Sequence, residues 1–309
     1  MLPDKFRRPV DLIQISASGW CEYKCGFCAA GKAHPPARLF PTEWLLRFIT
    51  IMAALGLKRA RLIGGGEPLL RPDILELVHG LVRIKQLTSV SLSTNGRFLK
   101  EKSEGLSQAG LHRLFVTIPS LNPSIFAHIT GFDELPRTLD GLEAASVAYK
   151  IPASVKMTLV PGVNEGEILP LVDFSVERGL DIYIVETQGV PGSKPMSSET
   201  IVKTVGGKYQ LTRMEGAALS NNPWKLEGTG TAMKVVTRDD LRTCGACNRL
   251  WLTAEGVVSL CNQVMTHVDL NEVLAEEPTD EELALVVAKI AMNKPMHPVA
   301  RCIETSLPD

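Results

Sequence analysis

Three cysteines stand close together near the start of the chain, in the stretch CEYKCGFC at residues 21–28. Three residues separate Cys21 from Cys25, and two separate Cys25 from Cys28. Three thiolates suit a [4Fe–4S] cluster whose fourth iron is left for a ligand from outside the protein. A zinc site is the alternative, although structural zinc prefers four protein ligands in a closed site. The stretch therefore predicts an iron–sulfur cluster with one open iron.

A second group of three cysteines lies near the other end of the chain. Two residues separate Cys244 from Cys247, and Cys261 follows after LWLTAEGVVSL, which is typical of two short strands around an Ala-Glu-Gly turn. Such a hairpin brings the cysteines at its two ends together. One interpretation is a second cluster with three ligands. The other is zinc with a distant fourth ligand, either His267 or Cys302.

Composition limits the classes of function that the chain can have. It has 33 basic and 34 acidic residues among 309, with no basic run of the kind that binds nucleic acid. We find no secretory signal and no apolar window long enough to span a membrane, so a cytoplasmic location is expected. Thiols stay reduced there, so the clustering of six of the seven cysteines favours metal or cluster binding over disulfides.

Two short motifs follow predicted strands after the first cysteine group. The first is GGGEP at residues 64–68, where glycines let the backbone approach a ligand and Glu67 can accept hydrogen bonds from an ammonium group. The second is STNG at residues 93–96, where Thr94 and Asn95 can bind a ribose. The same residue types are also ordinary turn residues. Their places after the cysteine motif favour a binding role.

The elements that must position these motifs alternate over the first 190 residues. Strands are predicted at residues 10–16, 59–64, 89–93, 113–118, 153–160 and 181–186. Helices are predicted at residues 41–56, 73–84, 98–110, 135–149 and 168–179. Repeated strand–helix units predict a parallel sheet with helices outside, as a barrel or a doubly wound sheet. In a barrel the active site lies at the C-terminal strand ends, where both motifs and the first cysteines fall.

These motifs together resemble those of the radical S-adenosylmethionine (SAM) superfamily, and in particular the GTP 3',8-cyclases of molybdenum cofactor biosynthesis. The resemblance covers most of the chain and includes CEYKCGFC, FITIMAALGLKRARLIGGGEPLLRPDI, STNG, LNPSIFAHITG, KMTLVPGVNEGEI and CGACNRLWLTAEGVVSLC. It implies an α/β fold with an incomplete (β/α)6 barrel, a partial TIM barrel, over residues 1–190. It also implies a C-terminal extension over residues 191–309 that carries an auxiliary [4Fe–4S] cluster.

The resemblance also assigns the cofactors and their ligands. SAM would bind the open iron of the first cluster, which is expected to be held by Cys21, Cys25 and Cys28. The auxiliary cluster is expected to be held by Cys244, Cys247 and Cys261. The SAM contacts that it implies are Gly65, Gly66, Glu67, Pro68, Thr94, Asn95 and Thr117. Glu67 would orient the amino group of SAM, and Thr94 and Asn95 its sugar.

Two basic residues match family positions beside the substrate. Lys156 and Arg249 are the candidate catalytic residues. As the resemblance implies, a protein electron donor such as flavodoxin or ferredoxin reduces the first cluster. SAM is then cleaved to methionine and a 5'-deoxyadenosyl radical, which abstracts hydrogen from a small-molecule substrate held near the auxiliary cluster.

Three aromatic residues stand where the family has arginines that bind the GTP triphosphate. They are Trp20, Tyr183 and Trp251, and they either fill core space or line a pocket for a less anionic substrate. The chain also ends in IETSLPD, without the glycine-rich tail of the family. We therefore expect a radical SAM enzyme whose substrate is not a nucleoside triphosphate.

Three alternatives remain at this point. The first is a GTP 3',8-cyclase in which other residues compensate for the lost arginines. The second is a peptide-modifying radical SAM enzyme, which would need a peptide-docking domain, and the predicted first strand begins only about ten residues into the chain. The third is an electron carrier or a zinc-stabilised binding module without enzymatic activity, which GGGEP and STNG argue against.

Overall fold

The computed structural model describes residues 2–28, 34–187, 192–214, 223–236, 242–243, 247–261, 267–296 and 301–302. Cys244 lies outside these ranges, and only the backbone of Cys302 is described. The predictions made for these two residues therefore stay predictions. Within the described residues, no helix is long and apolar enough to cross a membrane.

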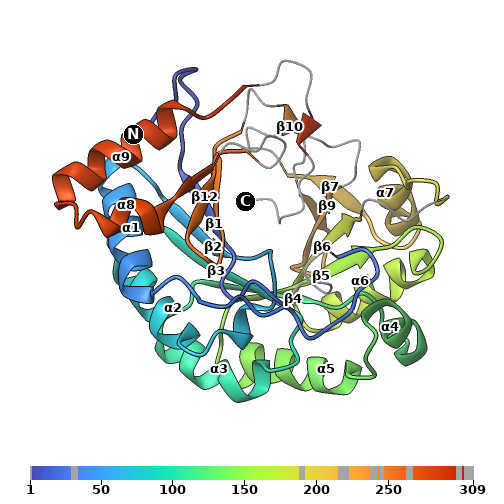
Figure 1. The fold of residues 1–309 in the computed structure, drawn as a ribbon. Helices are drawn as coiled ribbons and strands as arrows, with labels where there is room; N and C mark the ends of the chain where they lie inside the picture. Colours follow the sequence, from blue (N-terminus) through green and yellow to red (C-terminus); the bar gives the residue numbers. More distant parts are fainter. Residues whose placement is uncertain are drawn as a thin grey trace.

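The first part of the chain forms six parallel strands with helices on their outer face (Figure 1). The strands are β1 (Leu12–Ile15), β2 (Arg59–Leu62), β3 (Ser89–Thr94), β4 (Arg113–Thr117), β5 (Ala153–Leu159) and β6 (Asp181–Glu186). The helices between them are α1 (Thr42–Leu55), α2 (Ile74–Arg83), α3 (Leu99–Gln108), α4 (Pro123–Thr130), α5 (Leu135–Glu143) and α6 (Ile168–Glu177). The strands pair in sequence order from β1 to β6, so the predicted partial barrel is confirmed.

Strands from the C-terminal part extend this sheet at both of its edges. On one side β11 (Arg249–Leu252) pairs parallel with β1, followed by β12 (Val257–Ser259) and β13 (His267–Asp269). On the other side β9 (Ala232–Val236) pairs parallel with β6, followed by β8 (Trp224–Leu226) and β7 (Leu211–Arg213). A division of the chain near residue 190 stays a prediction, since both parts share one sheet.

The remaining elements lie around this sheet. They are α7 (Ser198–Gly206), α8 (Leu270–Ala275), α9 (Asp280–Met292) and the two-stranded pair β10 (Arg242–Thr243) and β14 (Arg301–Cys302). Helix α9 begins with a capping box in which Thr279 and Glu282 bond to each other's backbone. The predicted hairpin at 250–260 is confirmed as β11 and β12.

Alternating side chains of the strands serve two different surfaces. Ile13, Leu62 and Val155 belong to the main apolar core, which lies between the sheet and its helices. The intervening positions face the barrel interior, because successive residues of a strand point to opposite faces. A separate small apolar cluster forms there from Ile63, Phe115, Tyr183, Val185 and Val236.

The sequence analysis did not predict α4, although its ends carry clear signals. Asn122 caps the helix by accepting hydrogen bonds from the backbone N–H groups of Ser124 and Ile125, and Pro123 occupies its first turn. Gly131 ends it with a φ of 77°. The analysis also missed α7 to β9, where short strands lack the alternation that longer strands show.

Candidate active site

The first cysteine motif lies in the loop that leaves the C-terminal end of β1. Cys21, Cys25 and Cys28 are all partly exposed there. Tyr23, between them, is buried and stacks on Phe132 with ring centroids 5.3 Å apart. This contact holds the loop against the segment after α4, while the three cysteines remain partly exposed.

The glycines of GGGEP hold this loop in place by packing directly against it. A Cβ on Gly65 would lie 2.1 Å from Ser16 Oγ, and one on Gly66 would lie 2.3 Å from the backbone oxygen of Trp20. Both glycines have positive φ, at 59° and 145°. The backbone N–H of Glu67 also donates to Trp20 O at 2.8 Å. The motif therefore fixes the residue directly before Cys21.

The Glu67 carboxylate joins β2 to the turn after β3. Its Oε1 accepts hydrogen bonds from Thr94 Oγ1 at 2.6 Å and from Leu69 N at 3.0 Å, and its Oε2 accepts one from Asn95 N at 2.7 Å. Burial raises the pKa of Glu67 to about 7, although these three hydrogen bonds oppose the rise. With 2% of its surface exposed, this side chain acts as an internal brace.

Asn95 connects the same turn to the cysteine loop. Its Nδ2 donates to Glu22 Oε1 at 2.9 Å and lies 3.7 Å from Cys21 Sγ. Its Oδ1 accepts from the backbone N–H of Arg97. The predicted SAM residues Glu67, Thr94 and Asn95 are thus brought together beside Cys21, and their roles toward SAM stay predictions.

The donor set of the loop fits a cluster better than a single ion. Among the residues that the structure describes, no three His, Cys, Asp or Glu side chains converge on one metal ion. A four-iron cluster is bound differently, since each thiolate coordinates a separate iron. Burial raises the pKa of the Cys21 thiol, with Glu22 and Glu67 adding to the rise, and burial raises that of Cys25 to about 12. Bound iron would supply the positive charge that these thiolates need.

A layer of side chains in register crosses the barrel interior on the side opposite β1. Thr117 pairs with Lys156, Lys156 with Tyr183, and Tyr183 with Lys234. The Tyr183 ring is buried and meets Phe115 edge-on at 5.1 Å. Burial lowers the pKa of Lys156 to about 8, and the nearby Cys28 opposes this shift. Lys156 thus lies in the space between the first cysteine loop and the barrel interior.

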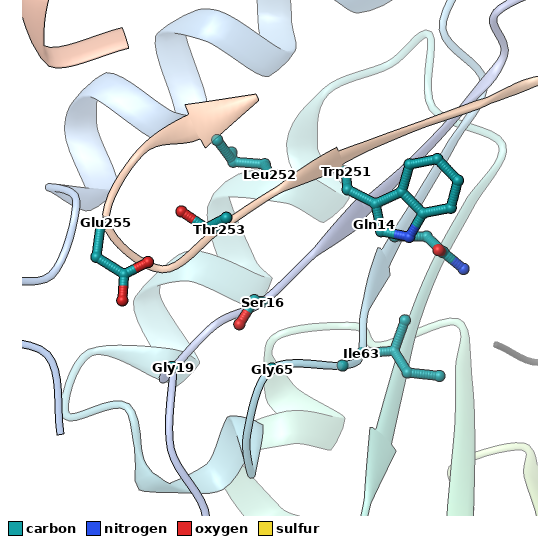
Figure 2. A pocket seen from close by; sticks show the side chains of 10 residues that line it. Gln14, Ser16, Gly19, Ile63, Gly65, Trp251, Leu252, Thr253 and Glu255 are labelled. Carbon is teal, nitrogen blue, oxygen red and sulfur yellow. The ribbon is translucent and has the colours of Figure 1, made fainter. Parts of the chain in front are cut away.

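A pocket of about 400 Å³ opens on the β1 side of the interior. Figure 2 shows the Trp251 ring and the Gln14 side chain next to each other on the paired strands β11 and β1. Gln14 Nε2 is buried and has no hydrogen-bond partner among the described residues. Ser16 and Gly65 also line this pocket, which places it beside the GGGEP turn. Trp251 therefore lines this pocket, and its role in substrate binding stays a prediction.

The interior strand positions are rich in positive charge. Arg61, Lys156, Lys234 and Arg249 occupy inward positions of β2, β5, β9 and β11, and Arg61, Lys234 and Arg249 are at most 7% exposed. On the same face of the sheet, Asp181 lies at the start of β6 beside Arg113, and Asp269 lies at the end of the edge strand β13. The interior therefore suits an anionic ligand.

Sequence analysis missed two of these four cations. Arg61 lies on a predicted strand, one alternation before Ile63, so the period of that strand was a signal for it. Lys234 lies on β9, whose stretch AMKVV was not predicted as a strand. The third aromatic residue, Trp20, is partly exposed, and its backbone rather than its ring makes the contacts described above.

The second cysteine group flanks the β11–β12 hairpin, and two of its members are described. Cys247 and Cys261 are both buried, at the open end of the hairpin. Burial raises the pKa of Cys247, but Lys294 and Arg249 outweigh this effect and the net shift is downward. His267, the proposed zinc ligand, is exposed on β13.

Comparison with known proteins agrees with this arrangement. The model of the radical SAM superfamily matches residues 15–175. A GTP 3',8-cyclase of Hydrogenovibrio crunogenus is 32% identical over 310 residues, which cover 95% of this chain and 93% of the relative. A GTP 3',8-cyclase of Listeria welshimeri is 30% identical over 308 residues, with coverages of 96% and 91%.

Two solved structures share the fold. Streptococcus suis SuiB bound to S-adenosylmethionine has a TM-score of 0.66 at 16% identity, and the match covers 91% of this chain and 68% of SuiB. The structure of anSMEcpe with bound AdoMet has a TM-score of 0.60 at 14% identity, with coverages of 86% and 80%. At these identities the likeness concerns the fold alone.

Proposed function

The chain belongs to the GTP 3',8-cyclase family of radical SAM enzymes, and we propose that it acts on GTP, with the triphosphate held in the barrel interior. SAM and two [4Fe–4S] clusters are its cofactors, and a small molecule is its substrate. The sequence analysis favoured a substrate other than a nucleoside triphosphate. The relatives favour the alternative that it kept open.

The observation that carries this proposal is the charge of the interior. Tyr183 stands where one arginine is expected, but Lys234 is its in-register neighbour on the adjacent strand, and neighbouring strands are about 4.8 Å apart. Trp251 stands where another arginine is expected. It pairs in register with Gln14 on β1, and Gln14 pairs in register with Arg61 on β2. Together with Lys156 and Arg249, these residues place at least four cations at inward strand positions, which supports binding of a polyanion.

The remaining residues hold the reactants in place. When bound and reduced, the first cluster would supply the electron that cleaves SAM. Gly65 and Gly66 fix the cysteine loop, and Glu67 braces it against the turn that carries Asn95. We assign the triphosphate to the inward-facing cations, of which Lys156 interacts with Cys28 of the first cysteine loop.

The test is anaerobic turnover with the reduced, reconstituted enzyme and SAM. The substrates are GTP, GMP, guanosine, ATP and a peptide mixture, and both 5'-deoxyadenosine and the product mass are measured. We expect GTP to stimulate SAM cleavage most and to be consumed. Stimulation by guanosine or a peptide but not by GTP would overturn the proposal and restore the substrate predicted from the aromatic residues.

A further inference from the structure

A lysine is buried against one of the cysteines of the second group. Lys294 Nζ donates a hydrogen bond to Cys247 Sγ at 2.8 Å. Lys294 is 1% exposed and Cys247 is 7% exposed. A buried ammonium group costs several kcal/mol in lost hydration unless an anionic partner compensates it. The position is therefore built for a negatively charged sulfur.

The segment that carries Lys294 is fixed from two sides. Its backbone N–H donates to Ala291 O at 3.1 Å, which continues the end of α9. On the other side, Arg8 Nη2 donates to Pro295 O at 2.7 Å and is within 3.4 Å of Lys294 O. Arg8 is itself buried and paired with Asp4. The lysine is thus held against the thiol by both ends of the chain.

We propose that Lys294 is a positioning residue that raises the reduction potential of the auxiliary cluster through its hydrogen bond to Cys247. This inference rests on the assignment of Cys247 as a ligand of that cluster. Reduction adds one negative charge to the cluster, and a buried cation at a ligand sulfur stabilises the reduced form more than the oxidised form. A higher potential follows from that difference.

The first cysteine loop has a different electrostatic setting. Glu22 and Glu67 act on Cys21, and Asn95 Nδ2 lies 3.7 Å from its sulfur, while Lys156 acts on Cys28. Negative neighbours disfavour the reduced form of a cluster. Cys247 thus has a cation hydrogen-bonded to its sulfur, whereas Cys21 lies beside two carboxylates.

The test isolates the auxiliary cluster in the full-length chain. Cys21→Ala, Cys25→Ala and Cys28→Ala together remove the SAM cluster, and the remaining cluster is titrated by EPR at controlled potentials. In this background, Lys294→Met removes the charge and Lys294→Arg keeps it. We expect Met to lower the reduced-to-oxidised ratio at a fixed potential at least tenfold, which is about 59 mV for one electron. Arg is expected to restore most of that loss.

The outcomes separate the inference from the assignment on which it rests. If the triple variant binds no iron, the assignment of the hairpin cysteines is wrong. If it holds a cluster and Lys294→Met leaves the potential unchanged, the inference is overturned. If Lys294→Met fails to load iron, Lys294→Gln, which keeps a donor without the charge, replaces it, and the same tenfold shift is required.

Discussion

Replacing Lys234 with Met tests whether the barrel interior binds a triphosphate. Met keeps most of the length and apolar volume of the lysine and removes its charge. Lys234 is 5% exposed, so bulk water cannot take its place freely. A hydrogen bond to a charged group contributes about 1.5–3 kcal/mol, which corresponds to an affinity loss of about tenfold to a hundredfold.

The assay is equilibrium binding of GTP and of guanosine to the cluster-loaded enzyme with SAM present. We expect Lys234→Met to lower the affinity for GTP by this factor. The affinity for guanosine should change by no more than about twofold, because guanosine has no phosphate to contact the lysine. Lys208→Met is the matched control, since Lys208 is 53% exposed and pairs with Asp173 on the surface. Such an exposed pair contributes little, so no change is expected.

A second variant tests the register argument. Tyr183 is the in-register neighbour of Lys234, so Tyr183→Arg in the Lys234→Met background returns a cation to the same layer from the adjacent strand. We expect it to recover at least half of the lost binding free energy. If Lys234→Met lowers the affinities for GTP and guanosine equally, or changes neither affinity, the charge of the interior does not recognise phosphate and the reasoning fails.

Three further tests concern the GGGEP motif and the cysteine ligands of the two clusters. Gly66→Ala should lower both iron content and the melting temperature because its Cβ has no space at a φ of 145°, while Gly166→Ala, which meets nothing within 4 Å, should change neither. For cluster-free protein, the raised pKa of Glu67, about 7, means that the folded state holds this proton more tightly than the unfolded state. Its stability should therefore fall as pH rises from about 4.5 to 7, by at most about 3 kcal/mol, and thermal melts of Glu67→Gln should lack this slope. Cys28→Ala and Cys261→Ala should each lower iron from about eight to about four atoms per chain, and unchanged iron in either would contradict its assignment.

The sequence predicted the barrel well because each of its strands and helices has a recognisable pattern within its own short stretch of sequence. Each predicted strand in the first 190 residues overlaps an observed one, since buried parallel strands are continuous apolar runs flanked by turn residues. The cysteine motifs were equally readable, because their spacing lies within a few residues. Arg61 was within reach too, as the alternation of its strand places it on the inner face.

Other features depend on contacts between distant parts of the chain. Lys234 becomes an interior residue only because β9 pairs with β6, and no local pattern in AMKVV reveals that pairing. Lys294 lies in a polar stretch after α9, and its contact with Cys247 joins residues 47 positions apart. Glu67 was predicted to face a ligand, and its three internal hydrogen bonds could not be read from GGGEP alone.

A cation at an inward position of one barrel strand can replace a cation on the neighbouring strand and still attract a bound anion. In a parallel sheet, residues in register on neighbouring strands are about 4.8 Å apart, less than the reach of a lysine side chain. Lys234 beside Tyr183 can therefore supply the charge that an arginine on β6 would supply. A lysine cannot supply the planar fork of an arginine, which binds two phosphate oxygens at once. An interior with two lysines and two arginines should thus hold a triphosphate by charge more than by geometry. From this difference it follows that GTP binding here should depend on the number of phosphates and should tolerate changes in their spacing, which GTP analogues with altered bridging atoms would measure.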